Sequence, residues 1–315
     1  MIVGFIGLGN LGSKLAGTLI RNNVKTFVHD LKPERAGPLL ERGGFWAERV
    51  SDAVNHSDIV VTCLPSPKIS AEVIERKNGV FDSITTGKIW IEMSTTQASE
   101  VVRIAQKLEE KNVLSADCPV SGGCHRAETG NISIFAGCER QTFEKIKSIL
   151  FIMGQNILHT GPLGTASQLK VMTNFLATTN LVACCEALTT MRAANIDLAI
   201  TYEAIKISSG NSFVHETESQ VILNGSRDIN FTLDLVLKDI KLFQELADRL
   251  NIPLDISPLL NNVIARAIGK LGPQANSPSI VSLLEEKTGF SITSPGFPSQ
   301  IDDSEPETLG FEVFP

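Results

Sequence analysis

Three glycines near the N-terminus, Gly7, Gly9 and Gly12, have the spacing of a phosphate-binding turn. They follow an apolar run, IVGFIG, and precede a helix-forming stretch, SKLAGTLIRN. In such a strand-turn-helix unit the first glycine permits a tight turn, the second lets the backbone approach a pyrophosphate, and the third allows close packing. The N-terminus of the helix adds N–H donors and a positive dipole. The pattern therefore predicts a dinucleotide site, with Asn10 and Leu11 also in contact with the ligand.

Asp30 ends the next strand-like run, KTFVH, eighteen residues after Gly12. A carboxylate at this place accepts hydrogen bonds from an adenosine ribose diol and repels a 2′-phosphate. This favours NAD over NADP as the cofactor, although the nearby cations Lys32 and Arg35 weaken the repulsion. The alternative is that Asp30 is merely exposed at a turn.

Lys170 and Asn174 form a second constellation, because residues four apart share one face of a helix. Oxidising an alcohol by hydride transfer needs a base for the hydroxyl proton. A lysine can serve when burial and a positive nicotinamide ring disfavour its charged form. In the reverse direction the same ammonium protonates a carbonyl oxygen. Considered alone, Lys170 can equally be an ordinary lysine that extends from a helix into water.

Four segments together resemble the β-hydroxyacid dehydrogenase family, and the resemblance extends over residues 1–287. They are GFIGLGNLG, DCPVSGG, GPLGTA with Lys170 and Asn174, and FTLDLVLKDIKL. The resemblance implies an α/β Rossmann-type dinucleotide-binding domain, followed by an all-α domain built around a long interdomain helix. It also implies an NAD-dependent oxidoreductase that interconverts a small β-hydroxyacid and its semialdehyde or keto acid.

The resemblance also implies roles for individual residues. Lys170 would transfer the proton and Asn174 would orient the substrate. The substrate carboxylate would bind Ser121, Gly122 and Gly123. Beyond the glycine turn, the implied cofactor contacts are Leu64, Pro65, Thr95 near the nicotinamide, and Lys238, which would close over the cofactor and also serve the substrate.

Departures from the family pattern concern the substrate. Arg126, beside His125, occupies a position where glycine is usual in the family. Its guanidinium can bind a second anionic group of the substrate, or it can turn outward to a surface carboxylate such as Glu128. Ala166 and Thr173 also replace a common glycine and a common asparagine. The particular hydroxyacid, and whether it carries one or two negative charges, therefore stays open.

The length of 315 residues exceeds what one hydrophobic core supports, so we expect more than one domain. Over residues 1–163, β-branched runs alternate with helix-like stretches, which predicts a mostly parallel sheet that carries the dinucleotide site. Residues 164–287 show helical periodicity and predict an all-helical substrate and dimerisation domain. Residues 288–315 are rich in Pro, Gly, Ser and acidic residues, and predict a poorly structured acidic tail that a neighbouring subunit could bind.

Composition narrows the possible partners and the compartment. Five acidic residues lie in the tail, which leaves 30 acidic against 28 basic residues elsewhere, so a nucleic acid is not expected as a partner. Six cysteines without a CxxC pair, and histidines without ligand spacing, favour a reducing cytoplasm and no metal. The longest apolar helix contains Asn180 and Glu186, so no membrane span is expected. The expected partners are a small anionic hydroxyacid and further copies of the chain, as a homodimer or homotetramer.

Two other functions remain open from the sequence. An imine reductase would share the architecture, and a non-catalytic scaffold or sensor could bind NAD through the same glycine turn. The presence of Lys170 argues against both, since many imine reductases replace this lysine and a scaffold has no use for it.

Overall fold

The chain forms two compact units in the computed structural model, which describes residues 1–314. Unit 1 comprises Met1–Lys170 and Asp303–Pro315, and unit 2 comprises Val171–Asp302. The units meet within one long helix, α9 (Thr165–Ala193).

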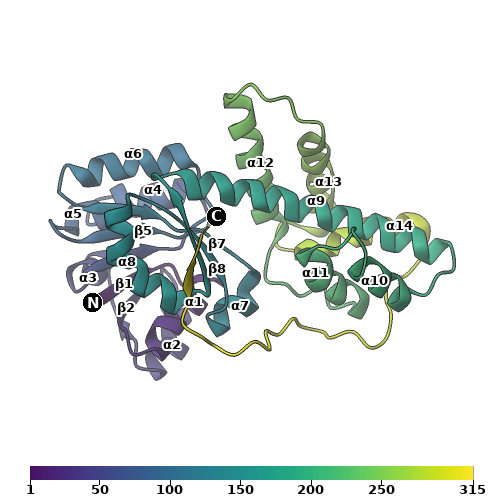
Figure 1. Ribbon diagram of the computed structural model, residues 1–315, viewed down its shortest axis with the longest axis horizontal. Coiled ribbons are helices and arrows are strands. Elements are labelled where there is room, and N and C mark those ends of the chain that lie inside the picture. Colours follow the sequence, from purple (N-terminus) through teal and green to yellow (C-terminus); the bar gives the residue numbers. More distant parts are fainter. Residues whose placement is uncertain (315) are drawn as a thin grey trace. The chain divides into compact units, whose positions relative to one another are not determined.

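Unit 1 is built on a ten-stranded sheet in the order β10-β9-β8-β6-β5-β4-β1-β2-β3, with β7 beside β8 (Figure 1). All strand pairs are parallel except those that β8 makes with β6 and β7. The strands are β1 (Ile2–Ile6), β2 (Lys25–His29), β3 (Phe45–Trp46), β4 (Ile59–Thr62), β5 (Ile89–Glu92), β6 (Leu114–Asp117), β7 (Val120–Ser121), β8 (Ser133–Gly137), β9 (Asn156–Gly161) and β10 (Phe311–Val313).

Helices cover both faces of this sheet, which explains why the central strands are apolar at successive positions. Ile59 and Val61 of β4 face one buried cluster, and Val60 between them faces the other. The first cluster is completed by α1 (Gly12–Arg21), α2 (Gly37–Glu41), α7 (Gly123–Thr129) and α8 (Arg140–Met153). The second is completed by α3 (Val50–Asn55), α4 (Pro67–Glu75), α5 (Val80–Ser83) and α6 (Ala98–Glu109). The predicted Rossmann-type sheet is confirmed.

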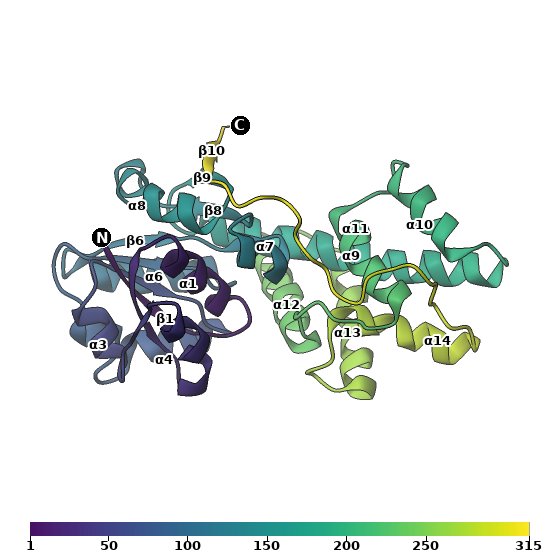
Figure 2. The ribbon, with the colours of Figure 1, turned by 90° about the horizontal axis from the view of Figure 1, so that it is seen from below.

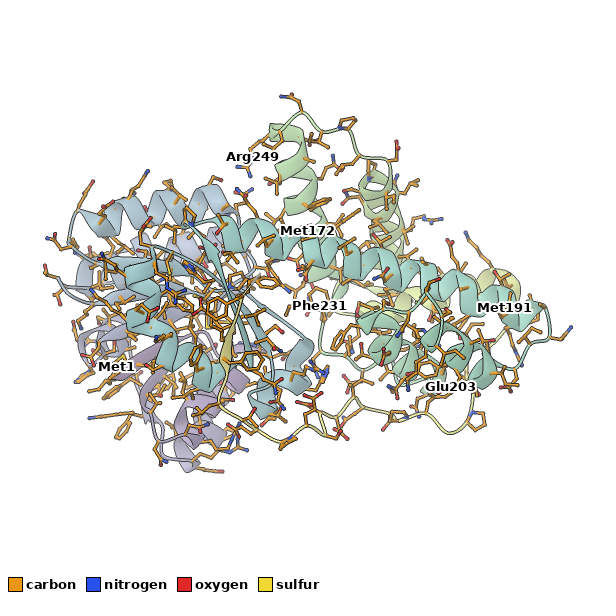
Figure 3. All side chains as sticks on the ribbon, viewed as in Figure 1. Met1, Met172, Met191, Glu203, Phe231 and Arg249 are labelled. Carbon is orange, nitrogen blue, oxygen red and sulfur yellow. The ribbon has the colours of Figure 1, made fainter. Side chains whose placement is uncertain are left out.

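Unit 2 is all-helical, as predicted, and packs around the distal part of α9 (Figure 2). Leu181, Cys185 and Leu188 of α9 are buried in one cluster with Val236 and Ile240. Figure 3 labels Met172 and Met191 along this helix. The other helices are α10 (Leu198–Lys206), α11 (Phe213–Asn224), α12 (Leu233–Arg249), α13 (Ile256–Leu271) and α14 (Ser282–Thr288), with 3-10 turns at Pro33–Ala36 in unit 1 and Ser277–Val281 in unit 2.

Helix α9 is the one helix of residues 1–314 long and apolar enough to cross a membrane, with a mean hydropathy of 1.2 over its best window. A single such helix is weak evidence, since the core helix of a water-soluble protein has the same length and composition. Here Leu181, Cys185 and Leu188 face the core of unit 2.

The C-terminal tail differs from the prediction of a poorly structured segment. Its first part packs on unit 2, where Ile292 is buried and the Ser294 N–H donates to the Leu223 carbonyl at 2.8 Å. Its last part adds β10 to the edge of the sheet, parallel to β9 (Figure 2). The physical reason is that the backbone of β10 completes an open sheet edge, while the acidic side chains find basic partners on unit 1.

Glu218 on α11 gives a prediction about stability. Its carboxylate accepts a bond from Ser277 Oγ at 2.8 Å, and burial raises its pKa to about 7. Between the ordinary value and about pH 7, the unfolded chain gives up this proton before the folded chain does, so stability falls as pH rises through that window. Glu218→Gln should therefore stabilise the protein at pH 8 by on the order of 1 to 2 kcal/mol, and not at pH 4.

Thermal melting at the two pH values measures this difference. Glu216→Gln, on the same helix, is the matched control. An equal melting temperature for Glu218→Gln and the parent at pH 8 would contradict the prediction.

Candidate active site

The glycine turn between β1 and α1 has the geometry that a dinucleotide needs. Gly7 has φ +102°, and a Cβ there would lie 2.3 Å from the Cys63 carbonyl oxygen. A Cβ on Gly12 would lie 2.1 Å from the Gly7 carbonyl oxygen, so only glycine lets the helix pack this closely on the strand. A Cβ on Gly9 would meet nothing within 4 Å. The first and third glycines thus serve the fold, and the second leaves open space where a pyrophosphate can approach.

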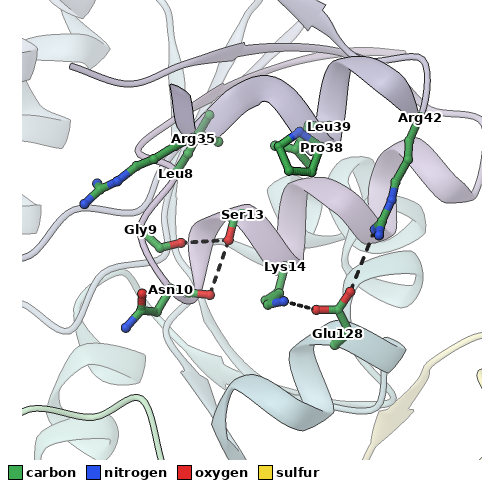
Figure 4. Close-up of a pocket in the computed structure, with 10 residues that line it drawn as sticks. All are labelled: Leu8, Gly9, Asn10, Ser13, Lys14, Arg35, Pro38, Leu39, Arg42 and Glu128. Atoms are coloured by element: carbon green, nitrogen blue, oxygen red, sulfur yellow. Dashed lines mark hydrogen bonds and ion pairs between the residues drawn. The ribbon is translucent and has the colours of Figure 1, made fainter. Parts of the chain in front are cut away.

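The N-terminus of α1 borders a cavity of about 280 Å³ (Figure 4). The N-cap residue of α1, Leu11, provides no side-chain hydrogen bond to the helix, and the first turn of α1 carries no acidic residue. The N–H groups and the dipole at this helix end therefore suit an anion. Lys14 and Arg42 line the same cavity, and both form ion pairs with Glu128. Asn10 also lines the cavity, as expected for a cofactor contact.

Asp30, immediately after β2, is fixed by the same turn. Its Oδ2 accepts a bond from the Leu8 N–H at 2.7 Å, and its Oδ1 accepts one from the Lys32 N–H at 2.9 Å. Arg35 Nη1 lies 3.4 Å from both oxygens. The side chain of Asp30 is only 9% exposed, so it is not a carboxylate that merely lies at a turn. Its remaining lone pairs can accept bonds from a ribose diol.

A buried carboxylate positions the loop after β4. Glu92 ends β5 with 1% exposure, and it accepts bonds from the N–H and the hydroxyl of Ser94. The Ser94 oxygen in turn accepts the Leu64 N–H at 2.7 Å. Burial raises the pKa of Glu92, while the bonds from Ser94 lower it, and the net pKa is above its usual range. This series of hydrogen bonds fixes the backbone of Leu64, which precedes the exposed Pro65. Thr95 follows Ser94 and is half-buried.

A second buried carboxylate anchors α9 to the sheet. Asp117 ends β6 and is fully buried, and its two oxygens accept the N–H groups of Gly164 at 2.9 Å and Ser167 at 2.7 Å. Burial raises the pKa of Asp117 against the effect of these bonds. Lys170 stands one helical turn beyond Ser167, with 7% exposure. The anchor therefore sets where the lysine lies relative to the end of β6.

The segment after β6 holds the implied substrate loop. Ser121 is the last residue of β7 and pairs with Ser133 of β8. Gly122 and Gly123 have φ +130° and +87°, which ordinary side chains rarely adopt, so the chain turns sharply into α7 there. Arg126 on α7 lies over Gly122 and forms an ion pair with an exposed carboxylate, Glu305. This agrees with the alternative of a surface carboxylate as its partner, while Glu128, the example named from the sequence, pairs with Lys14 and Arg42.

Two implied residues of unit 2 share one acidic partner. Asp239, on α12 and 2% exposed, accepts a bond from Asn174 Nδ2 at 2.5 Å and pairs with Lys238 Nζ at 2.7 Å. The carboxylate thereby fixes the amide of Asn174 and the ammonium of Lys238 relative to each other. Asn174 stands one turn after Lys170 on α9, as the spacing predicts.

Within unit 1, the sheet brings most of the predicted residues to one edge. The strands β1, β2, β4, β5 and β6 are parallel. The glycine turn follows β1, and Asp30, Leu64 and Thr95 follow β2, β4 and β5 in that order. Ser121 lies in β7, shortly after β6. The carboxyl ends of parallel strands meet at one edge, where α/β proteins bind their ligands.

Sequence reasoning did not recognise the residues that hold this arrangement: Glu92, Ser94, Asp117 and Asp239. Asp117 and Asp239 lie in the quoted segments DCPVSGG and FTLDLVLKDIKL, but no positioning role was assigned to them. For the three acidic residues the signal is a carboxylate at the end of an otherwise apolar strand or within an amphipathic helix; Ser94 has no such signal. That signal becomes specific only when burial and a partner are known. Among residues 1–314, no three His, Cys, Asp or Glu side chains are grouped so that they could hold a metal ion.

Two family models match almost all of the two-domain region. Residues 2–161 match the NAD-binding domain of 6-phosphogluconate dehydrogenase. Residues 164–284 match the "NAD-binding of NADP-dependent 3-hydroxyisobutyrate dehydrogenase" model. The chain belongs to the β-hydroxyacid dehydrogenase family.

Individual relatives of the family agree with this. A 2-(hydroxymethyl)glutarate dehydrogenase of Eubacterium barkeri is 30% identical over 92% of this chain and 97% of its own. The crystal structure of a 3-hydroxyisobutyrate dehydrogenase from Salmonella typhimurium has a TM-score of 0.82 at 25% identity, covering 90% of this chain and 99% of that one. An imine reductase from Myxococcus stipitatus in complex with NADP+ has a TM-score of 0.63 at 20% identity, covering 90% and 99%. This last likeness concerns the fold alone.

As a member of the family, the protein is an oxidoreductase that uses a nicotinamide dinucleotide and acts on the CH–OH group of a β-hydroxyacid.

The Asp117 anchor gives a prediction. Asp117→Asn keeps the size of the side chain but presents an NH₂ group to one of the two N–H donors. The free energy of unfolding should fall by about 1 to 3 kcal/mol, because one buried donor loses its acceptor. Urea denaturation measures the change. The control is Ser115→Ala on the same strand, whose buried hydroxyl has no hydrogen-bond partner; equal stability of the two variants would show that Asp117 is no anchor.

Proposed function

We propose that the protein is an NAD-dependent dehydrogenase of a β-hydroxyacid that carries a second carboxylate. The observation that carries this proposal is a buried lysine, Lys170, one turn beyond the Asp117 anchor in unit 1. The second carboxylate is supported by Arg126, which follows the Ser121–Gly123 loop, and by the name of the E. barkeri relative, since 2-(hydroxymethyl)glutarate is a dicarboxylate.

The residues of this chain divide the work as follows. Ser121 and the N–H groups of Gly122 and Gly123 hold the carboxylate next to the reacting carbon. Lys170 Nζ takes the proton from the hydroxyl oxygen during oxidation and returns it to the carbonyl oxygen during reduction. Asn174 orients the same oxygen through its amide. When bound, the nicotinamide ring supplies the hydride acceptor or donor.

Burial favours this role for Lys170. An enclosed amine gives up water contacts that would stabilise its charge, so it can accept and release a proton within one catalytic cycle. Asp239 holds the amide of Asn174, which lies one turn after Lys170 on the same face of α9.

The choice of NAD over NADP rests on Asp30. Its carboxylate is fixed by two backbone N–H groups, so it cannot turn away from a 2′-phosphate. We expect kcat/KM for NAD to exceed that for NADP by at least about tenfold, which needs only ~1.4 kcal/mol. Steady-state kinetics with both cofactors measure the ratio. Asp30→Asn should reduce it and Asp58→Asn should not; equal efficiency with both cofactors in the parent would contradict this assignment.

The role of Lys170 is tested by Lys170→Met, which keeps the length of the side chain and removes the amine. Turnover should fall by roughly 10² to 10⁴, because no other group replaces the proton carrier. NADH binding, measured by fluorescence titration, should be unchanged. Lys145→Met, at an exposed position on α8, is the control. Near-normal turnover of Lys170→Met at neutral pH would disprove the proposed proton transfer.

An imine reductase is the second candidate, supported only by the likeness in fold. It predicts reduction of a cyclic imine with no requirement for a carboxylate on the substrate, which the same assays can detect. A cytoplasmic location and a homodimeric or homotetrameric state remain part of the proposal. Gel filtration with light scattering measures the oligomeric state.

A further inference from the structure

The last residues of the chain dock on unit 1 through acidic side chains. Asp303 Oδ2 accepts a bond from Asn131 Nδ2 at 2.8 Å and another from the Thr129 hydroxyl. Asn131 is fully buried, and it also donates to the Glu305 carbonyl at 3.0 Å. Burial would raise the pKa of Asp303, but the bonds from Thr129 and Asn131 leave that pKa below its usual range. The start of the docked segment is therefore firmly placed beside α7.

The other end of the docked segment is fixed as well. β10 pairs in parallel with β9, and Glu312 forms an ion pair with Arg140 of α8. Between the two anchors, Glu307 binds Arg21 Nε at 2.8 Å and Asn22 Nδ2 at 2.7 Å. Residues between Asp303 and β10 are thus held against α1 and α7 from both sides.

Glu305, near the first anchor, meets the arginine of the substrate loop. Its Oε1 lies 3.4 Å from Arg126 Nη2. Arg126 stands three residues after Gly123, and a Cβ placed on Gly122 would lie 3.2 Å from Arg126 Cδ, so the stem of the arginine covers the loop. Asp303 adds a second negative charge near the same guanidinium. The guanidinium of Arg126 is therefore paired with a carboxylate of the same chain, Glu305, at the point where the arginine extends beyond the loop.

The Glu305–Arg126 ion pair is weak by itself, but the anchored tail holds Glu305 close to Arg126. The two side chains are 51% and 26% exposed, and such pairs contribute little to stability. The anchors on either side, however, keep Glu305 at a high local concentration around Arg126. A carboxylate held in this way competes with a ligand but can still be displaced by one.

The tail lies outside the matched family models, the second of which ends at residue 284. The Glu305 contact is therefore not part of the region by which the chain was assigned to its family.

We propose that Glu305 is a specificity-determining residue, which occupies Arg126 in place of the second carboxylate of the substrate. This inference rests on the proposed function. In the enzyme without substrate, Glu305 of the tail pairs with the guanidinium of Arg126. A dicarboxylic hydroxyacid displaces Glu305 and binds Arg126 through its second carboxylate. A monocarboxylic hydroxyacid has no second carboxylate for Arg126, so the tail does not affect its binding. The preference between the two substrates is thereby set by the tail.

The test compares Glu305→Gln with Glu307→Gln, two matched changes in one segment, in the full-length enzyme with NAD. The substrates are 2-(hydroxymethyl)glutarate as the dianion and 3-hydroxyisobutyrate as the monoanion. Glu305→Gln should lower KM for the dianion by about two- to fivefold, the scale of an exposed ion pair. It should leave kcat and the monoanion unchanged. Glu307→Gln, which releases Arg21 and not Arg126, should alter neither substrate.

A third variant, Arg126→Gln, separates the two levels of the proposal. It should raise KM for the dianion by at least about tenfold and abolish the difference that Glu305→Gln makes. If Arg126→Gln affects both substrates alike, the dicarboxylate assignment fails. If it affects the dianion while Glu305→Gln and Glu307→Gln behave alike, only the role of the tail fails.

Binding provides a readout that does not depend on turnover. Calorimetric titration of the NADH-loaded protein with glutarate, a dianion without a reacting hydroxyl, should show tighter binding to Glu305→Gln than to the parent. Titration with butyrate should show no difference. Equal affinity of glutarate for both proteins overturns the inference, even if neither hydroxyacid is oxidised.

Discussion

The buried carboxylate of Asp117 is the interaction on which the active site depends. It lies at the last position of β6, and it accepts the N–H groups that open α9. A buried carboxylate is stable only when hydrogen bonds replace its lost water, and the free N–H groups of a helix N-terminus provide these bonds. The same contact fixes the first turns of α9, and with them the buried amine of Lys170.

Glu92 repeats this design on the neighbouring strand. It pairs with Asp117 in the β5–β6 ladder, and both end their strands without exposure to solvent. Where Asp117 holds a helix, Glu92 holds the loop of Leu64 through Ser94. In each case a carboxylate that is costly to bury accepts hydrogen bonds from N–H or hydroxyl donors, and these donors must be accurately located. Two adjacent strand ends thus fix Lys170, the proposed proton carrier, and the loop of Leu64, a proposed cofactor contact.

The proposed substrate side combines a glycine turn with an arginine that the docked tail contacts. Gly122 and Gly123 have positive φ angles, which depend on glycine. Arg126 and the docked tail add a cation and an internal carboxylate beside that turn. Changing an exposed ion pair costs the fold little, so the proposed specificity could be altered there while the anchors of Lys170 are kept.

The sequence by itself determined the glycine turn, the parallel sheet, the helical second unit and the helical face shared by Lys170 and Asn174. These follow from local rules, because spacing and periodicity express backbone geometry within a few residues. The tertiary structure alone decided the partners of Asp117, Glu92 and Asp239, and it corrected the prediction of a poorly structured tail. It also brought an exposed carboxylate, Glu305, to Arg126. The bonds of Asp117 to Gly164, Asn174 to Asp239, Leu64 to Ser94 and Arg126 to Glu305 join residues 30 to 179 positions apart. No local pattern records them, because they arise only when the fold brings distant segments together.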